Sequence, residues 1–209
     1  MDDQHLMEHR LASEELFRGS FLCALRDTVR LPDGGTSVRE FVLHPGAVVV
    51  IALLPDDGAG LRLVLERQYR YPVGQVMIEF PAGKRDPDET ALQCAMRELR
   101  EETGYSATEW ARAGVTHPVV AYSTEAIEIW FARGLHAGAR MLDQGEFLEV
   151  FSATPQQLLQ WCRDGQVTDS KTLAGALWVQ NVLSGAWSLD WQPQPPAAGT
   201  NRADRAAAG

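Results

Sequence analysis

The sequence has few basic residues, and this shortage limits the partners that it can bind. Lys and Arg number 19 against 28 Asp and Glu, so the formal net charge of the 209-residue chain is −9. Such a charge disfavours binding to phosphate backbones and to anionic lipid surfaces. We therefore expect neither nucleic acid nor a membrane as a partner.

Cysteines and long hydrophobic runs are also scarce. Cys23, Cys94 and Cys162 lie far apart and form no CxxC pair, which favours neither a disulfide framework nor a thiolate zinc site. The longest wholly apolar run, residues 47–54, is much shorter than the roughly 20 residues of a membrane-spanning helix. The N-terminus is acidic and lacks the apolar core of a secretory signal. These features predict a soluble cytoplasmic protein.

Several common catalytic signatures are missing from the chain. It contains no GxGxxG after a predicted strand, no GxxxxGK[ST], no GxSxG and no HExxH. Dinucleotide oxidoreduction, P-loop hydrolysis, serine esterase chemistry and zincin chemistry therefore lack their usual residues.

What is present suits one globular domain with a small extra lobe. Hydrophobic residues make up 45% and charged residues 22% of the chain. Residues 21–31 and 36–44 flank Asp33-Gly34-Gly35 and predict an N-terminal β-hairpin. The strands expected for a mixed sheet are residues 47–54, 61–66, 75–80, 115–122, 126–132 and 146–152.

Start and stop signals predict helices over residues 86–104, 154–165 and 169–185. In the first helix, Asp86 is the expected N-cap with Pro87 at N1, and Glu89 completes a capping-box-like pair. Gly104 supplies the C-terminal glycine. The Pro-, Ala- and Gly-rich residues 190–209 predict a disordered tail.

The first predicted helix concentrates acidic residues on one side. Glu98, Glu101 and Glu102 fall within a sector of about 100° near its C-terminal half, where they repel one another and oppose the helix dipole. A hard divalent cation would compensate them, and oxygen ligands without His or Cys favour Mg²⁺ or Mn²⁺ over zinc. The alternative is a solvated helix with ordinary ion pairs, such as Arg97 with Glu101.

The spacing of these acids resembles the box of the Nudix hydrolase superfamily, G-x5-E-x7-R-E-U-x-E-E-x-G-U. Leu99 occupies the first aliphatic position, whereas Tyr105 departs from the last one. The upstream segment ERQYRYPVGQVMIEFPAG and the downstream segments AYSTEAIEIWFARGL and GEFLEVF resemble the ADP-ribose pyrophosphatase and nucleotide-sugar hydrolase branch. All seven fixed box positions match, at Gly83, Glu89, Arg97, Glu98, Glu101, Glu102 and Gly104.

The resemblance, which covers roughly residues 17–187, implies a fold and a domain division. The expected fold is α/β, a Nudix-type α/β/α sandwich with a mixed sheet and an N-terminal antiparallel β-lobe. Residues 1–45 would form the lobe and pair two subunits into a homodimer, 46–189 would form the hydrolase domain, and 190–209 the tail.

The resemblance also assigns roles to residues around the metal. Glu98 and Glu102 would ligate Mg²⁺ together with the Ala82 carbonyl, with two or three ions per site and Mn²⁺ as a possible substitute. Glu101 would ligate an ion or orient a bridging water. Glu146 would be the general base, with Glu101 as the second choice; the alternative for Glu146 is an ordinary acid in a turn. Arg97 and Glu89 would brace the junction between loop and helix.

On the substrate side, the resemblance points to three further residues. Arg70 would hold phosphate oxygens and Glu79 ribose hydroxyls, with surface ion pairing as the alternative. Arg39 would reach the adenine side, or would simply be solvated.

The implied reaction is Mg²⁺-dependent hydrolysis of ADP-ribose or a related nucleoside diphosphate sugar, which gives a nucleoside monophosphate and a sugar phosphate. Other substrates stay open, namely GDP-mannose, dinucleoside polyphosphates and coenzyme A. A non-catalytic, ligand-sensing Nudix domain is a further alternative.

Overall fold

The fold is built on an eight-stranded mixed sheet. In the computed structural model, residues 3–55, 58, 60–142 and 144–195 are described. The main strand order is β10-β5-β4-β9-β8-β11, with β6 paired to β5 and β7 to β4. The strands are β4 (Ala47–Leu54), β5 (Arg62–Arg70), β6 (Gln75–Glu79), β7 (Ala82–Lys84), β8 (Tyr105–Thr116), β9 (Ile127–Ala137), β10 (Leu148–Ala153) and β11 (Gln192–Pro193).

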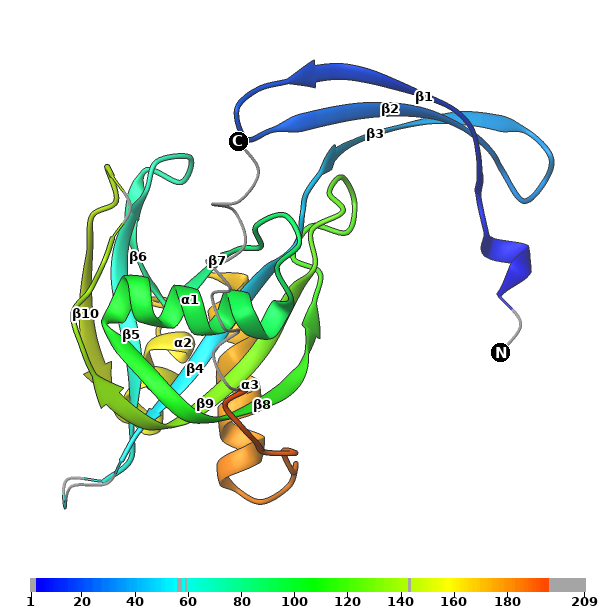
Figure 1. The fold of residues 1–209 in the computed structure, drawn as a ribbon. Helices are drawn as coiled ribbons and strands as arrows, with labels where there is room; N and C mark the ends of the chain where they lie inside the picture. Colours follow the sequence, from blue (N-terminus) through cyan, green and yellow to red (C-terminus); the bar gives the residue numbers. More distant parts are fainter. Residues whose placement is uncertain (1–2, 56–57, 59, 143, 196–209) are drawn as a thin grey trace, which may run out of the picture.

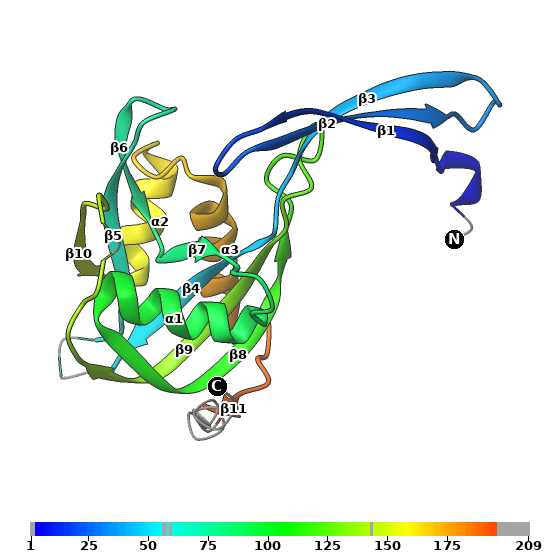
Figure 2. The same cartoon turned by 45° about the horizontal axis from the view of Figure 1, so that its top comes forward.

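Helices cover both faces of this sheet (Figures 1 and 2). α1 (Ala91–Thr103) packs on one face, and α2 (Pro155–Arg163) and α3 (Ser170–Leu183) pack on the other. Successive side chains of β4 alternate between the two cores: Val48 and Val50 lie on the α1 side, Val49 and Ile51 on the α2–α3 side. This alternation explains the continuous apolar run, and the predicted α/β/α sandwich with a mixed sheet is confirmed.

The N-terminal residues form a separate three-stranded antiparallel sheet, which we call the arm. It consists of β1 (His9–Arg18), β2 (Cys23–Arg30) and β3 (Thr36–Leu43), preceded by a 3-10 turn, η1 (Gln4–Leu6). The arm extends away from the body (Figures 1 and 2). The predicted hairpin corresponds to β2 and β3, but the sequence analysis missed β1. Every residue of β1 is exposed, so no hydrophobic periodicity marks it as a strand.

The first helix begins later than predicted. Thr90 is its N-cap and forms a capping box with Gln93, so Asp86 is not the cap. Asp88 has a positive φ of 64°, which a helix cannot accommodate. Glu89 still binds Asp86, accepting its backbone N–H at 3.1 Å, but this contact closes a turn before the helix. The helix ends at Gly104 as predicted, in the left-handed conformation.

The strand predicted over residues 115–122 is wrong for most of its length. β8 starts directly after α1 at Tyr105 and ends at Thr116, and residues 118–122 are in turns. β8 was not predicted as a strand because charged residues interrupt its apolar positions. In the structure these charged residues pair with residues of β9: Glu109 binds Arg133, and Arg112 binds Glu128.

The predicted tail is only partly within the described residues. Gln192 and Pro193 pair with β8 as a short strand, whereas residues 196–209 lie outside the described part of the chain. No helix among the described residues combines the length and the apolar character needed to cross a bilayer.

Candidate active site

A cleft of about 540 Å³ brings the predicted acids together. Glu98, Glu101 and Glu102 of α1 line it, as does Glu146 from the turn before β10. Its walls also include Ala82 and Gly83 of β7, Arg70 of β5 and Lys171 at the start of α3, as well as Phe21, His44 and Lys84. Residues that are far apart in the sequence therefore meet at one end of the central sheet.

Gly83 is required by the position of Glu98. A Cβ atom at Gly83 would lie 1.9 Å from Oε1 and 2.0 Å from Cδ of Glu98. No side chain fits there, so glycine allows the Glu98 carboxylate to pack directly against the backbone of β7. This close approach explains why the first position of the box is a glycine.

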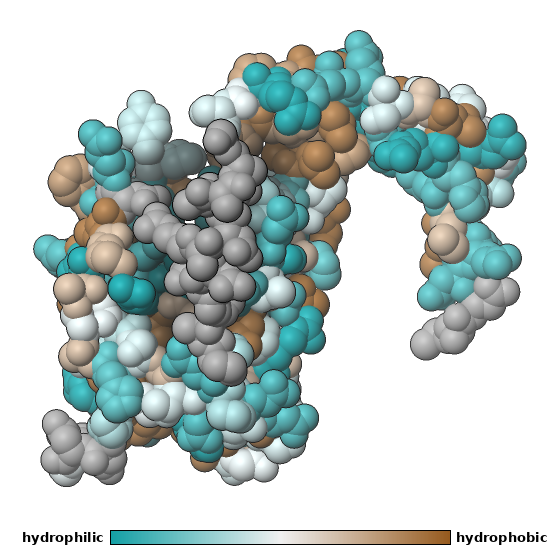
Figure 3. All heavy atoms as spheres, viewed as in Figure 1, coloured by the Kyte–Doolittle hydropathy of each residue, from teal (hydrophilic) through white to brown (hydrophobic). Residues whose placement is uncertain are grey.

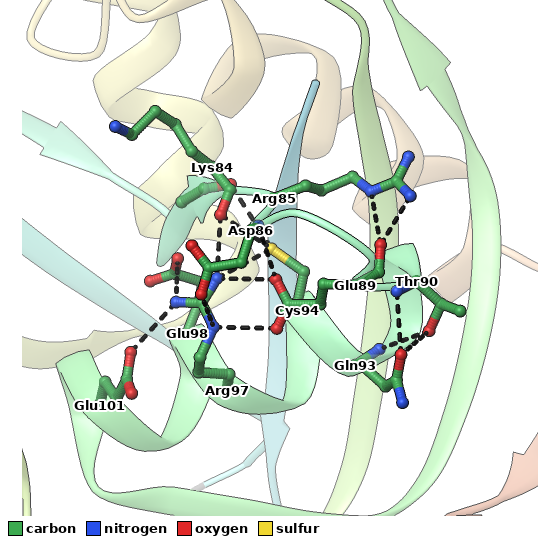
Figure 4. Close-up of polar contacts among 11 residues, drawn as sticks. Lys84, Arg85, Asp86, Glu89, Thr90, Gln93, Cys94, Arg97, Glu98 and Glu101 are labelled. Carbon is green, nitrogen blue, oxygen red and sulfur yellow. Dashed lines mark hydrogen bonds and ion pairs between the residues drawn. The ribbon is translucent and has the colours of Figure 1, made fainter. Parts of the chain in front are cut away.

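Arg97 connects the loop before α1 with the acids on the helix (Figure 4). Its Nε and Nη2 donate to the two carboxylate oxygens of Glu89, each at 2.9 Å, and Nη2 also donates to the Lys84 carbonyl at 2.9 Å. Nη1 donates to Glu98 at 2.6 Å and to Glu101 at 3.1 Å. The hydrogen bond from Arg97 holds the pKa of Glu89 below its usual value.

Glu102 is almost completely buried, with 3% of its surface exposed. Its Oε2 accepts the backbone N–H of Ala82 at 3.0 Å, which ties α1 to β7. Burial raises the pKa of Glu102 to about 10, and the charge of Glu66 adds to the rise. A carboxyl group this far from its ordinary titration range marks a place where negative charge is concentrated without compensation.

Glu98 has a smaller shift in the same direction. Burial raises its pKa to about 7, although its contacts with Arg97 act in the opposite direction. The charges of Glu101 and Glu146 also contribute to the rise. Glu98 therefore remains electrostatically strained even with a guanidinium bound to it.

Glu66 of β5 is a member of this group that the sequence analysis missed. It is fully buried, and burial raises its pKa to about 8, with the charge of Glu79 adding to the effect. One signal was present in the sequence: Glu66 interrupts the apolar strand residues that follow Gly60. Its position two residues after the buried Val64 places it on an inward face of the strand.

Arg70 and Glu79 bind each other inside the protein. Two parallel hydrogen bonds of 2.8 Å join the guanidinium to the carboxylate, and Lys171 also binds Glu79. Burial acts to raise the pKa of Glu79, but the hydrogen bond from Arg70 and the charge of Lys171 hold it below the usual value. Glu79 is only 1% exposed and is not among the residues lining the cleft. The pair therefore has one buried member, Glu79, and one partly exposed member, Arg70, and the roles of both toward a substrate stay predictions.

Arg39 lies on the arm, outside this cleft. It donates to Glu8 at 2.9 Å and to Ser37 at 2.9 Å, and it is not among the lining residues. Its role near adenine stays a prediction, which would require the arm to meet the cleft of a second copy of the chain.

The residues of the cleft fit a divalent cation by their donor chemistry. Glu98, Glu101, Glu102 and Glu146 offer only carboxylate oxygens. Glu66 does not line the cleft, but its two buried oxygens have no hydrogen-bond partner among the described residues. Within the described residues, no three His, Cys, Asp or Glu side chains already converge as a ready-made metal cluster. A bound cation would therefore draw side chains together, notably Glu98 and Glu101 from Arg97.

Two known protein families match adjacent segments of the chain. The NUDIX domain matches residues 43–174, and the nucleoside diphosphate sugar hydrolase N-terminal domain matches residues 8–42. Proteins of the NUDIX family generally use divalent metal ions.

Similar proteins include two ADP-ribose pyrophosphatases. The one from Bacillus subtilis is 33% identical over 84% of this chain and 94% of its own length, and the one from Mycobacterium tuberculosis is 31% identical over 93% and 96%. A methanol dehydrogenase activator from Bacillus methanolicus is 36% identical over 83% of this chain and 92% of its own. Among solved structures, an ADP compounds hydrolase has the same fold, with a TM-score of 0.75 at 21% identity over 87% of this chain and 97% of that one.

Proposed function

The chain belongs to the NUDIX family, and on that basis we propose that it hydrolyses the pyrophosphate bond of ADP-ribose or a related nucleoside diphosphate sugar. The products are a nucleoside monophosphate and a sugar phosphate. The observation that carries this proposal is the set of uncompensated carboxylates around the cleft, above all Glu98 and Glu102, at the positions of the family box. The similarity to ADP-ribose pyrophosphatases over most of the chain supports the substrate class.

An acidic cleft binds an anionic diphosphate only when its own charge is neutralised. Mg²⁺, with Mn²⁺ as a substitute and two or three ions per site, would supply that neutralisation and would draw electron density from the phosphoryl oxygens. We propose that Glu98 and Glu102 hold the ions with the Ala82 carbonyl, and that Glu101 holds an ion or orients a bridging water. Arg97 and Glu89 brace the junction between the loop after β7 and α1.

Glu146 is the proposed general base. It lines the cleft from the turn before β10, whereas the other three acids come from α1. Gln68 on β5, the strand paired with β10, donates to its Oε1 at 3.4 Å. In the reaction, the Glu146 carboxylate accepts a proton from water as the water oxygen attacks phosphorus, and the bridging P–O bond breaks. Glu101 is the second candidate for this proton.

The substrate side is proposed to use Arg70 and Glu79. Because Arg70 lines the cleft while Glu79 holds its guanidinium from behind, Arg70 is oriented toward phosphate oxygens. The buried position of Glu79 makes its contact with ribose indirect, through Arg70 or Lys171.

A homodimer formed through the arm is also part of this proposal. Within the described part of the chain, β1 is an edge strand that pairs only with β2. Hydrophobic residues are exposed along the arm (Figure 3), among them Leu11, Leu16, Phe17 and Val38. An exposed hydrophobic edge of this length favours pairing with another chain. Residues 1–45 would then form the dimerisation lobe and 46–189 the hydrolase domain. We further propose a cytoplasmic enzyme without a nucleic acid or membrane partner, given the net charge of −9.

The test is a panel of ADP-ribose, ADP-glucose, GDP-mannose, dinucleoside polyphosphates and coenzyme A, assayed with Mg²⁺ for the released monophosphate. Release of AMP from ADP-ribose well above the other rates supports the proposal. Preference for a dinucleoside polyphosphate or coenzyme A would move the chain to another substrate class. Tight ADP-ribose binding without turnover, unchanged in Glu102→Gln, would identify a ligand sensor.

A further inference from the structure

Glu66 occupies an unusual position for an acidic residue. It lies in the central part of β5, fully buried, and neither of its carboxylate oxygens has a hydrogen-bond partner among the described residues. Burying a carboxylate without a partner is strongly unfavourable, and an apolar side chain would suit this strand better. The fold alone therefore gives no reason for an acid here.

The strand directs Glu66 toward the α1 side of the sheet. Its neighbours on the same face are Val64 and Gln68. Val64 packs in the core beneath α1, and the Gln68 amide donates to Glu146 at 3.4 Å. Glu66 thus lies between the core under α1 and the acids of the cleft.

The groups around Glu66 do not neutralise it. Acidic residues face it from three elements: Glu79 on the paired strand β6, Glu102 on α1 and Glu146 on the turn before β10. The nearby bases are Arg70 and Lys171, and both already bind Glu79.

We propose that Glu66 is a positioning residue of the divalent-cation site, whose charge behind Glu102 strengthens cation binding in the cleft. The inference rests on the proposed function, since it presumes that Glu102 holds a cation. A bound cation would compensate the carboxylates of Glu66 and Glu102 together. Groups behind metal ligands typically change metal affinity by about 10-fold to 100-fold when removed.

The experiment measures Mn²⁺ binding directly, by electron paramagnetic resonance of free Mn²⁺, together with thermal unfolding in chelator and in excess Mn²⁺. The full chain is compared with Glu66→Gln and with Glu66→Met, which fills the strand with apolar volume. Asp27→Asn is the matched control, because Asp27 is also buried with an unpartnered Oδ1 but lies on the arm.

We expect both Glu66 variants to be at least as stable as the wild type in chelator, because a buried carboxyl group without a hydrogen-bond partner has been removed. Their Kd for Mn²⁺ should rise about tenfold or more, and Mn²⁺ should raise their Tm less. Asp27→Asn should bind Mn²⁺ like the wild type.

Mn²⁺ affinity in the Glu66 variants within twofold of the wild type would overturn the inference and leave the proposed function intact. If neither variant folds in chelator, Glu66 supports the fold instead, and the inference is also overturned. A wild-type chain that binds no Mn²⁺ would overturn both this inference and the proposed function.

Discussion

The carboxylates at the two ends of the Nudix box lie in different environments. At the loop that leads into α1, Glu89 is held by two hydrogen bonds from Arg97, and its pKa is lowered. In the C-terminal half of α1, Glu102 has one backbone donor, and burial raises its pKa to about 10. The same residue type is therefore ionised and stabilises the fold at one end, whereas at the other end it lacks a basic partner and its charged form is disfavoured. The lack of a compensating base, and not acidity itself, marks the part of the box that we propose binds cations.

Removing an uncompensated acid should produce the largest loss of activity. Glu102→Gln should lower kcat/KM roughly 10²- to 10³-fold, because a proposed cation ligand is lost. The same variant should unfold at an equal or higher temperature in chelator, because a neutral amide replaces a buried carboxyl group whose charged form is disfavoured. Steady-state kinetics and thermal unfolding measure both effects. Glu109→Gln, at the exposed pair with Arg133, is the control and should keep full activity; a Glu102→Gln enzyme as active as this control would contradict the comparison.

The packing of Glu98 on β7 predicts the next effect. In Gly83→Ala the new methyl group would overlap the carboxylate, since its position lies 1.9 Å from Oε1 of Glu98. Glu98 must move, and a displacement of about 1 Å at a reacting site can lower the rate about 10²-fold. Gly35→Ala, in the turn of the arm, meets the side chains of Asp33 and Leu31, far from the acids of the cleft, and should leave kinetics unchanged. Equal rates for the two variants would show that the Glu98 position is unimportant.

A substitution at the Glu89–Arg97 end of the box should mainly lower the stability of the fold. Arg97→Lys keeps the positive charge but cannot donate to Glu89 through two nitrogens while also reaching Glu98 and the Lys84 carbonyl. We expect a loss of about 1–3 kcal/mol in the free energy of unfolding, measured by urea denaturation in chelator. The rate should also fall about tenfold, because Arg97 no longer fixes the position of α1 relative to β7. A variant as stable as the wild type would remove the structural role of this end.

Stability should depend on pH in opposite directions at the two ends. Glu98, Glu66 and Glu102 have pKa values of about 7, 8 and 10 in the folded protein, above the ordinary 4.5. Between 4.5 and those values the folded state binds more protons than the unfolded chain, so stability falls as the pH rises. Glu89, with its lowered pKa, contributes stability above pH 4.5 that is lost in more acidic solution.

Thermal unfolding in chelator should therefore show Tm falling from pH 5 toward pH 9. Excess Mg²⁺ should flatten this decline, because cations replace protons on the carboxylates. A Tm in chelator that is constant across this range would contradict the charge distribution proposed for the cleft.

An exposed pair sets the lower limit of the comparison. Arg26 and Glu40 on the arm form an ion pair of 2.7 Å with both side chains largely exposed. Glu40→Gln should change the free energy of unfolding by less than about 1 kcal/mol, and the change should shrink further in high salt. A larger loss in urea denaturation would show that exposed pairing on the arm matters as much as the buried network.

The box residues could be predicted from the sequence because the glycines and the acids lie at the spacings that the box requires. Gly104 ends the helix in the left-handed conformation, as its place after a helical pattern predicted. The start of the helix was harder, since Asp86 and Thr90 both offer capping oxygens. Only the positive φ at Asp88 excludes the earlier choice, and backbone dihedrals cannot be read from residue types.

Other parts of the site depend on contacts between distant segments. Lys171 reaches Glu79 from the start of α3, and no local pattern connects these two residues. β1 and most of β8 escaped prediction because exposed or cross-paired residues disguise their periodicity. Glu66 could have been found, because an acid at an inward position of an apolar strand is a conflict that usually has a functional reason.

The most direct test follows cation occupancy and hydrolysis in the same titration. Metal-free protein is titrated with Mn²⁺ in the presence of ADP-ribose, while free Mn²⁺ and released AMP are measured together. The account predicts no AMP release in chelator and a rate that rises in step with occupied sites. Hydrolysis that continues in chelator, or sites that fill without any cleavage of a diphosphate, would contradict it.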